Sequence, residues 1–394
     1  MRYCVIILDG AAGWPMPEYG GRTSLQAAST PHLDRLCREG AVGLAQTVPE
    51  GAEPSSSAAC TSILGYDPIS NYVGRGAIEA ASMGINLAPD EVALRLNLVT
   101  LDDGLMASYS AGHIPTCDSR ELVGEIAAVL DDGVTRLYPG IAYRHILVVK
   151  GHKELLACRY TPPHDISDKP WADHAPAGAG AELVIDYMER ARPVVAASAV
   201  RARRAEQGLA PTDVWPFWPG EAPAGLASFS ARYGVRAAMT SGVDLLNGLA
   251  VLLGIERLAI VGVTDGPDTD YAAQAEGALL ALDSHDLVVV HVESPDEAGH
   301  AGDAAAKIAA IEAIDAKIVS RVMASANGDL RILAMPDHPT PIEIKTHVGE
   351  PVPFVLWGPG VKRVAANTYD EFAAGETGLV VDPGHSVMEM LLER

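Results

Sequence analysis

Short apolar segments that alternate with longer helical patterns are the feature of this sequence that most constrains its fold. Each segment has the length and near-continuous hydrophobicity of a strand that is buried on both faces of a parallel sheet. This alternation predicts an α/β fold with a mostly parallel sheet flanked by helices. The predicted strands are 5–8, 258–263, 287–292, 332–334 and 353–357, and the predicted helices are 30–39, 242–253, 270–281 and 304–324.

The middle of the chain has a different pattern. Residues 94–101 and 105–110 flank Asp102-Asp103-Gly104, which is a hairpin signal, and a helical pattern at 118–130 follows them. Strand-like segments then come at 134–138, 143–149 and 154–160. We therefore expect a smaller α+β cap domain, residues 91–162, inserted into a core of residues 1–90 and 163–394.

Composition limits the partners of the chain. The formal net charge of −22 repels nucleic-acid phosphates, so an anionic substrate would need local positive charge from metal ions or arginines. No apolar stretch is long enough to cross a membrane, and the N-terminal apolar run is too short for a signal peptide. The five cysteines are widely spaced, which is typical of buried thiols in a reducing cytosol. These observations predict a cytoplasmic protein and leave its oligomeric state open, a homo-oligomer included.

Carboxylates and histidines follow several of the predicted strands, at the edge where open α/β sheets bind ligands. Any one of them could belong to a turn or an exposed helix end, but together they indicate a metal site. A helix-start signature at Ser294-Pro295 would place Asp296 and His300, which are four residues apart, on one face of a first helical turn. Mixed carboxylate and imidazole ligands suit Zn²⁺ or Mn²⁺ better than Ca²⁺. The candidate residues are Asp9, Asp296, His300, Asp337, His338 and His347.

A serine-rich stretch offers a nucleophile for such a site. Ser55, Ser56 and Ser57 precede an apolar helix start at Ile63-Leu64. A serine at a helix N-terminus, with its oxygen on a metal, would be activated for attack and would lie near backbone N–H groups that attract phosphate. Taken alone, the same stretch also fits a flexible loop.

At this point the sequence resembles the archaeal-type, cofactor-independent phosphoglycerate mutases of the alkaline phosphatase superfamily. The similar strings extend from residue 6 to about residue 360, which is nearly the whole chain. They include Leu8-Asp9-Gly10, Ser62-Ile63-Leu64-Gly65-Tyr66, Gly74-Arg75-Gly76, Pro163-His164-Asp165, Asp296-Glu297-Ala298-Gly299-His300 and Asp337-His338-Pro339-Thr340-Pro341.

The resemblance implies a fold and a role for each candidate residue. It implies an alkaline-phosphatase-like core and two divalent ions, Mn²⁺ or Zn²⁺, with Mg²⁺ or Co²⁺ as alternatives. Aligned on Ser62-Ile63-Leu64, the family's nucleophilic serine falls on Ser56, with Ser55 and Ser57 as alternatives. Arg75 would bind the substrate's phosphate or carboxylate. One ion would be held by Asp9, Ser56, Asp337 and His338, and the other by Asp296, His300 and His347.

The chain departs from the family pattern at two arginines, where it has Tyr109 and His113. We expect His113 to substitute in part, and a purely packed histidine is the alternative. The implied activity is the interconversion of 3- and 2-phosphoglycerate through a phosphoserine. The missing arginines favour another reading of the same site, a phosphatase or phosphotransferase on a different small phosphorylated metabolite, for example homoserine-kinase-like. A third hypothesis is a non-catalytic metal-binding protein.

Overall fold

A computed structural model describes residues 1–208 and 210–393 of the chain. Contacts between residues divide the chain into two units, a core unit and an inserted unit. The inserted unit is Val73–Ala224, and the core unit is made of the segments before and after it. The inserted unit therefore extends beyond the expected 91–162 at both ends. The reason is that α4 (Arg75–Ser82) and β7 (Asp213–Glu221) pack on β3 (Glu91–Asp102), the long central strand of this unit.

A mostly parallel sheet forms the centre of the core unit, as the alternating pattern predicts. Its strand order is β13-β2-β12-β11-β1-β10-β8-β9, and β12 alone among these strands runs antiparallel to its neighbours. In β1, the side chains from Val5 to Leu8 are fully buried. The strands are β1 (Arg2–Leu8), β2 (Ala41–Ala45), β8 (Ala237–Thr240), β9 (Glu256–Arg257), β10 (Leu287–Val292), β11 (Leu330–Met335), β12 (Val352–Trp357) and β13 (Val380–Val381).

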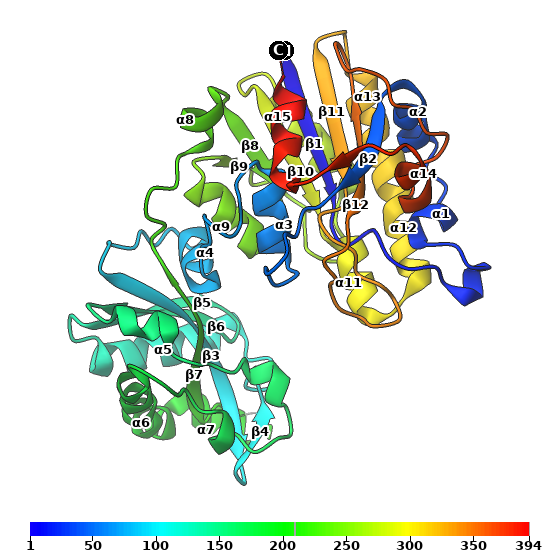
Figure 1. Ribbon diagram of the computed structural model, residues 1–394. Helices are drawn as coiled ribbons and strands as arrows, with labels where there is room; N and C mark the ends of the chain where they lie inside the picture. The colour runs from blue at the N-terminus through cyan, green and yellow to red at the C-terminus, as the bar shows by residue number, and fades with distance from the viewer. Residues whose placement is uncertain (209, 394) are drawn as a thin grey trace. The chain divides into compact units, whose positions relative to one another are not determined.

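The register at the centre of this sheet decides where the functional residues lie. Val5 of β1 is paired with Val289 of β10 on one side and with Leu333 of β11 on the other, all in parallel. The carboxyl ends of these three strands therefore reach the same edge of the sheet. Figure 1 shows β1 between β10 and β11 in this arrangement.

Two groups of helices cover the two faces of the core sheet (Figure 1). One group is α1, α2, α10, α12 and α13, and the other includes α3, α9 and α15. The predicted helix 304–324 is α12 followed directly by a π-helical turn, Asp315–Val319, and then α13. The core helices are α1 (Ser24–Ala27), α2 (Pro31–Glu39), α3 (Ser56–Ile63), α8 (Phe229–Tyr233), α9 (Asp244–Leu252), α10 (Tyr271–Ala281), α11 (Ser294–Ala301), α12 (Ala304–Ile314), α13 (Ser320–Ala324), α14 (Glu371–Glu376) and α15 (Val387–Leu392).

Two of the predicted core strands need correction. The segment 258–263 is not a strand, because the sheet ends at the short edge strand β9 and the chain beyond it leaves Val261 93% exposed. The strand that pairs with β10 on this side is β8, which the apolar pattern did not predict. The segment 353–357 is a strand, but β12 is antiparallel and not parallel.

An antiparallel sheet is the framework of the inserted unit. Strand β3 pairs with β4, β6 and β7, and β6 pairs with β5. Alternate residues of β3, from Val92 to Leu98, belong to the apolar core shared with α5 and α6, whereas Ala93 packs with α4 on the other face. The remaining elements are β4 (Leu105–Ser108), α5 (Thr116–Leu130), β5 (Thr135–Ile141), β6 (Arg144–Lys150), α6 (Ala181–Ala197) and α7 (Ala199–Ala205).

One predicted strand of the inserted unit is wrong. The segment 154–160 contains a 3-10 helix, Lys153–Ala157, because the positions beside β3 are taken by β6 and by β7. Among the residues that the structure describes, no helix has the length and apolar character needed to cross a membrane. The cytoplasmic location stays a prediction.

Burial of His145 in β6 leads to a testable pH dependence of stability. Burial, with Arg95 and Arg120 nearby, lowers the pKa of His145 from 6.5 to about 3. Its Nδ1 accepts the Gly140 N–H at 3.0 Å. The folded chain keeps the imidazole neutral while the unfolded chain takes up a proton below pH 6.5, so stability is lost as the pH falls. Between pH 6 and 4, we expect the unfolding free energy of the native chain to decrease more steeply than that of His145→Gln, by about 1.4 kcal/mol per pH unit.

Denaturant titrations at several pH values measure this difference. The control is His152→Gln, at a partly exposed histidine of the same unit, which should keep the native slope. Equal slopes for His145→Gln and the native chain would contradict the prediction.

Candidate metal centre

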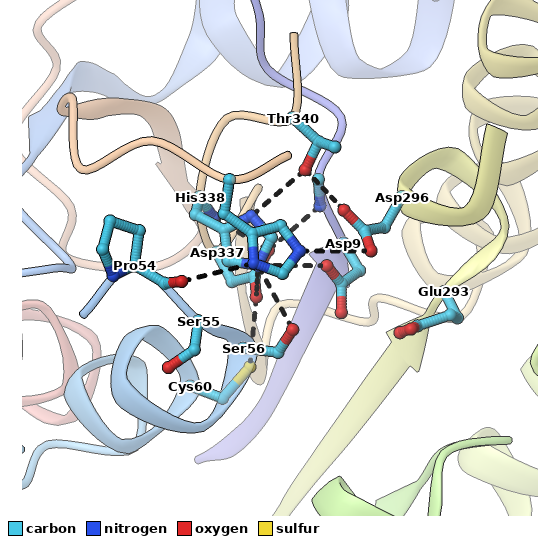
Figure 2. A network of polar contacts seen from close by, with 12 residues as sticks. Asp9, Pro54, Ser55, Ser56, Cys60, Glu293, Asp296, Asp337, His338 and Thr340 are labelled. Carbon is cyan, nitrogen blue, oxygen red and sulfur yellow. Dashed lines mark hydrogen bonds and ion pairs between the residues drawn. The ribbon is translucent and has the colours of Figure 1, made fainter. Parts of the chain in front are cut away.

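The segments that follow β1, β10 and β11 carry six of the seven core-unit residues singled out in the sequence, and α3 carries the seventh, Ser56. Asp9 directly follows β1, and Asp337-His338 lies two residues beyond β11. Asp296 and His300 lie on α11, which begins two residues after β10. Figure 2 shows Asp9, Asp296, Asp337, His338 and Ser56 pointing toward one another. Ser56 is the first residue of α3, and His347 comes from the loop after His338.

A first group of donors surrounds His338. Its Nε2 lies 3.2 Å from Asp337 Oδ2, 3.7 Å from Asp9 Oδ1 and 3.2 Å from Ser56 Oγ. Asp9, Asp337 and His338 are completely buried. Asp337 Oδ1 accepts the backbone N–H groups of Gly10 and His338, which fixes its orientation.

The three neighbouring serines have different surroundings. Ser55 is the N-cap of α3, and its Oγ accepts the Ala58 N–H at 3.4 Å. Ser57 Oγ lies 3.1 Å from Ser55 Oγ. Ser56 Oγ has the contact with His338 described above, so it is the serine hydroxyl that faces the metal-ligand candidates.

A second group is formed by Asp296, His300 and His347. Nε2 of His300 and Nε2 of His347 lie 2.9 Å apart. Oδ2 of Asp296 lies 3.0 Å from the His300 nitrogen and 3.6 Å from the His347 nitrogen. Nδ1 of His300 faces the backbone carbonyl of Lys345 at 3.0 Å, and Nδ1 of His347 faces that of Pro54 at 3.3 Å. Because a carbonyl only accepts, each Nδ1 carries a hydrogen, which leaves each Nε2 as the atom that can bind a metal ion beside the carboxylate. Metal-binding histidines are held in this orientation by a hydrogen bond from the other ring nitrogen.

Charge at this edge of the sheet requires compensation. Burial, together with Asp337 and Asp296, raises the pKa of Asp9 well above its ordinary value, and Oδ1 of Asp9 has no hydrogen-bond partner among the described residues. The hydrogen bond that protonated His300 donates to Asp296 raises the pKa of His300 to about 9, so a proton can take the place of a cation between these groups. Buried carboxylates and convergent imidazoles of this kind fit divalent metal ions.

The two groups are continuous through His338. The rings of His338 and His347 lie 4.1 Å apart between centroids, and His338 can also join Asp296 and His347 in one set of metal donors. The centre therefore has the layout of a site for neighbouring ions, with Ser56 on its His338 side.

Three residues that orient the candidate ligands were not predicted from the sequence. Thr340 Oγ1 donates to Asp296 Oδ1 and lies 3.3 Å from His338 Nδ1. Lys307 is fully buried and donates to the carbonyls of Ala12 and Thr340, which connects the loops after β1 and β11. His291 Nε2 lies 2.7 Å from Asp9 Oδ2. Of these, only His291, a polar residue inside an apolar strand, had a visible sequence signal.

Arg75 and His113 lie in the inserted unit. Arg75 Nε donates to Glu79 Oε1 at 2.8 Å, and its guanidinium lies 3.8 Å from the centroid of the Trp218 ring. His113 packs edge-on against Tyr109. Both His113 and Trp218 have left-handed backbone conformations, with φ of 51° and 46°. Such strain in bulky residues is concentrated at functional sites.

The fold and the centre together define a class: an α/β protein with a strand-end site for divalent metals and a serine at a helix N-terminus. Comparison with known proteins narrows this class. The family model of 2,3-bisphosphoglycerate-independent phosphoglycerate mutase matches residues 37–201. A probable mutase of this kind from Geobacter sulfurreducens is 44% identical over 404 residues, and one from Methanothrix thermoacetophila is 44% identical over 396, with complete coverage of both chains in each case.

Solved structures agree with these relatives. A protein from Pyrococcus horikoshii is similar over all of this chain and 96% of its own, with a TM-score of 0.86 and 26% identity. The cofactor-independent phosphoglycerate mutase from Thermoplasma acidophilum has a TM-score of 0.70 and 27% identity, over all of this chain and 99% of its own. The chain belongs to the 2,3-bisphosphoglycerate-independent phosphoglycerate mutase family, which confirms the resemblance seen in the sequence.

The hydroxyl of Thr340 provides a test of the centre. Thr340→Val keeps the shape of the side chain but removes the hydrogen bond to Asp296, so Asp296 and His338 lose a shared orienting contact. We expect divalent-metal affinity to fall by roughly 10–100-fold. Titration of the chelator-treated protein with Mn²⁺ measures the change. Thr368→Val is the control, because Thr368 donates to Asp370 at 2.7 Å in a comparable pair outside the centre. Native affinity in Thr340→Val would contradict the assigned role.

Proposed function

We propose that this chain is a cofactor-independent phosphoglycerate mutase, which interconverts 3-phosphoglycerate and 2-phosphoglycerate through a phosphoserine at Ser56. The contact of Ser56 Oγ with His338 Nε2, at the N-terminus of α3 and beside two groups of metal donors, is the observation that carries this proposal. Membership of the family supports the substrate, a small phosphorylated acid.

The assignment of ligands follows the two groups of donors. We assign Asp9, Ser56, Asp337 and His338 to one ion and Asp296, His300 and His347 to the other. Mixed carboxylate and imidazole donors suit Mn²⁺ or Zn²⁺, with Mg²⁺ or Co²⁺ as substitutes. When bound, such ions lower the pKa of a serine hydroxyl and neutralise charge on a transferring phosphoryl group.

The residues of the chain account for the transfer itself. Ser56 Oγ loses its proton and attacks phosphorus, the bond from phosphorus to the substrate oxygen breaks, and that oxygen takes up a proton. After the glycerate turns over, its other hydroxyl oxygen loses its proton and attacks phosphorus, the bond from phosphorus to Oγ breaks, and Oγ takes up a proton to restore Ser56. The first N–H groups of α3 favour the phosphoryl charge. Water must be excluded while the phosphoserine exists, because its hydrolysis would make the enzyme a phosphatase.

Substitution of Ser56 tests the nucleophile. We expect Ser56→Ala to lower mutase turnover by roughly 10³-fold or more, because no hydroxyl remains to take the phosphoryl group. An enolase-coupled assay with Mn²⁺ and 3-phosphoglycerate measures turnover. Ser55→Ala is the matched control: it removes the N-cap, at a cost of about 1 kcal/mol of stability, and keeps turnover. Undiminished activity in Ser56→Ala would exclude this serine.

A phosphatase or phosphotransferase on another metabolite is the second candidate, because Tyr109 and His113 stand where the family pattern has arginines. Release of inorganic phosphate, followed in the same assay, separates the two. Mutase turnover without phosphate release supports the first proposal. Phosphate release without 2-phosphoglycerate, in a metal-loaded sample, would favour the second.

Arg75 is proposed to bind the anionic end of the substrate, with His113 as a second contact. Glu79 and Trp218 hold the Arg75 guanidinium in place, which lowers the entropy lost on binding. We expect Arg75→Ala to raise KM by roughly tenfold or more, from loss of a charge-assisted contact. Arg35→Ala is a matched control, since Arg35 forms the same type of helical pair with Glu39 at 2.9 Å in the core unit. An unchanged KM in Arg75→Ala would contradict this role.

A further inference from the structure

The segment 10–13 directly follows Asp9 and lies against the loop after β11. The Ala12 carbonyl accepts the Thr340 N–H at 3.1 Å, and Ala12 also forms an isolated bridge with Pro339. The ion that we assign to Asp9 takes ligands from both segments, so their spacing has to be kept to within roughly 0.5 Å. The contacts that hold segment 10–13 in place therefore bear on metal binding.

A buried lysine of α12 joins these two segments. Lys307 is 0% exposed, and its Nζ donates to the carbonyl of Ala12 at 3.0 Å and to that of Thr340 at 2.7 Å. Removing an ammonium group from water is costly unless hydrogen bonds and nearby acids compensate for the lost hydration. Burial lowers the pKa of Lys307 to about 8, and the charges of Asp296 and Glu371 oppose this decrease. Both carbonyl contacts of the lysine thus fall where the two segments meet.

A carboxylate at the start of α14 holds the same segment at its far end. Glu371 Oε1 accepts the Gly13 N–H at 3.0 Å, and its Oε2 accepts the hydroxyl of Thr23 at 2.7 Å. Thr23 is the N-cap of α1, so the carboxylate is fixed on both sides. A Cβ atom added to Gly13 would lie 3.6 Å from Lys307 Nζ. The lysine and the carboxylate, which carry opposite charges, therefore reach the same short stretch of backbone.

We propose that Lys307 and Glu371 act together as positioning residues for the metal centre. They hold segment 10–13 between them, which keeps Asp9 at the distance from the loop after β11 that a shared ion needs. Neither residue belongs to the two groups of candidate ligands, so both act through the backbone. This inference rests on the proposed binding of ions at Asp9, but not on the identity of the substrate.

The direction of the change in metal affinity separates positioning from charge. If charge alone mattered, removal of the Lys307 ammonium would tighten the binding of a cation, because like charges repel. Positioning has the opposite effect, because the carbonyls of Ala12 and Thr340 lose the donor that they share and the two segments shift. The hydroxyl of Thr340 contacts Asp296 and lies near His338, so the shift reaches both groups of donors (Figure 2). Loss of the ammonium should therefore weaken metal binding.

Titration of the chelator-treated full chain with Mn²⁺ tests this proposal. We expect Lys307→Met, which keeps the apolar stem but loses the ammonium, to weaken Mn²⁺ binding by roughly 10–100-fold, and Glu371→Ala to do the same. The double variant should weaken it by less than the product of the two factors, because both residues act on the same segment. Glu371→Gln loses the same charge but keeps an acceptor for the Gly13 N–H, so it should recover most of the native affinity.

Two exposed residues provide matched controls, Lys317→Met in the helical turn after α12 and Glu376→Ala in α14, and both should keep native affinity. Native or tighter Mn²⁺ binding by folded Lys307→Met would overturn the proposal, as would losses that multiply in the double variant. If Lys307→Met fails to fold, Glu371→Ala decides the matter, and native affinity in that variant would overturn the proposal.

Mutase turnover of the native chain, measured in parallel, keeps this outcome separate from that of the proposed function. Weaker Mn²⁺ binding by the variants of a chain without mutase turnover would support the positioning role and remove the proposed activity alone. Native Mn²⁺ affinity in the variants of an active mutase would remove the positioning role alone.

Discussion

Parallel pairing of β1 with β10 and β11 is the constraint on which the candidate centre depends. It brings the carboxyl ends of three strands to one edge, so residues from 9 to 347 in the chain become neighbours. The strands themselves are mostly apolar and, apart from Arg2, buried, which fixes their register through packing. The loops beyond them can then carry charged groups, because rigid, buried strands hold the ends of those loops in place.

Concentration of buried negative charge is the cost of this arrangement, and the chain offsets it in several ways. Asp337 accepts backbone N–H groups, Asp296 accepts the Thr340 hydroxyl, and Lys307 adds a buried positive charge nearby. Burial lowers the pKa of Lys307 to about 8, and the neighbouring acids counteract this decrease. These contacts orient the ligands but leave Asp9 Oδ1 without a hydrogen-bond partner in the described part of the chain. The divalent cations that we propose would offset the surplus of charge and explain the convergence of His300 and His347.

The sequence was sufficient to predict the α/β class, the family and the residues at the strand ends, because short apolar runs and the polar residues directly after them are local signals. It was not sufficient where long-range pairing decides the structure. The direction of β12, the edge position of β9 and the pairing of β7 with β3 depend on segments far away in the chain. Lys307 lies in an alanine-rich helix without any motif, so its role follows only from the carbonyls that it reaches. The ligand assignments and the substrate contacts of Arg75 and His113 stay predictions.

The proposed activity requires that the strand-end residues hold divalent ions beside Ser56. Diffraction from crystals grown with Mn²⁺, recorded at the manganese absorption edge, tests it most directly. We expect anomalous density between Asp296, His300 and His347, and again between Asp9, Asp337 and His338 within coordination distance of Ser56 Oγ. Crystals grown with Mn²⁺ would contradict this if they showed no anomalous density at this edge of the sheet. In that case, Nε2 of His300 and Nε2 of His347 would also remain in hydrogen-bond contact.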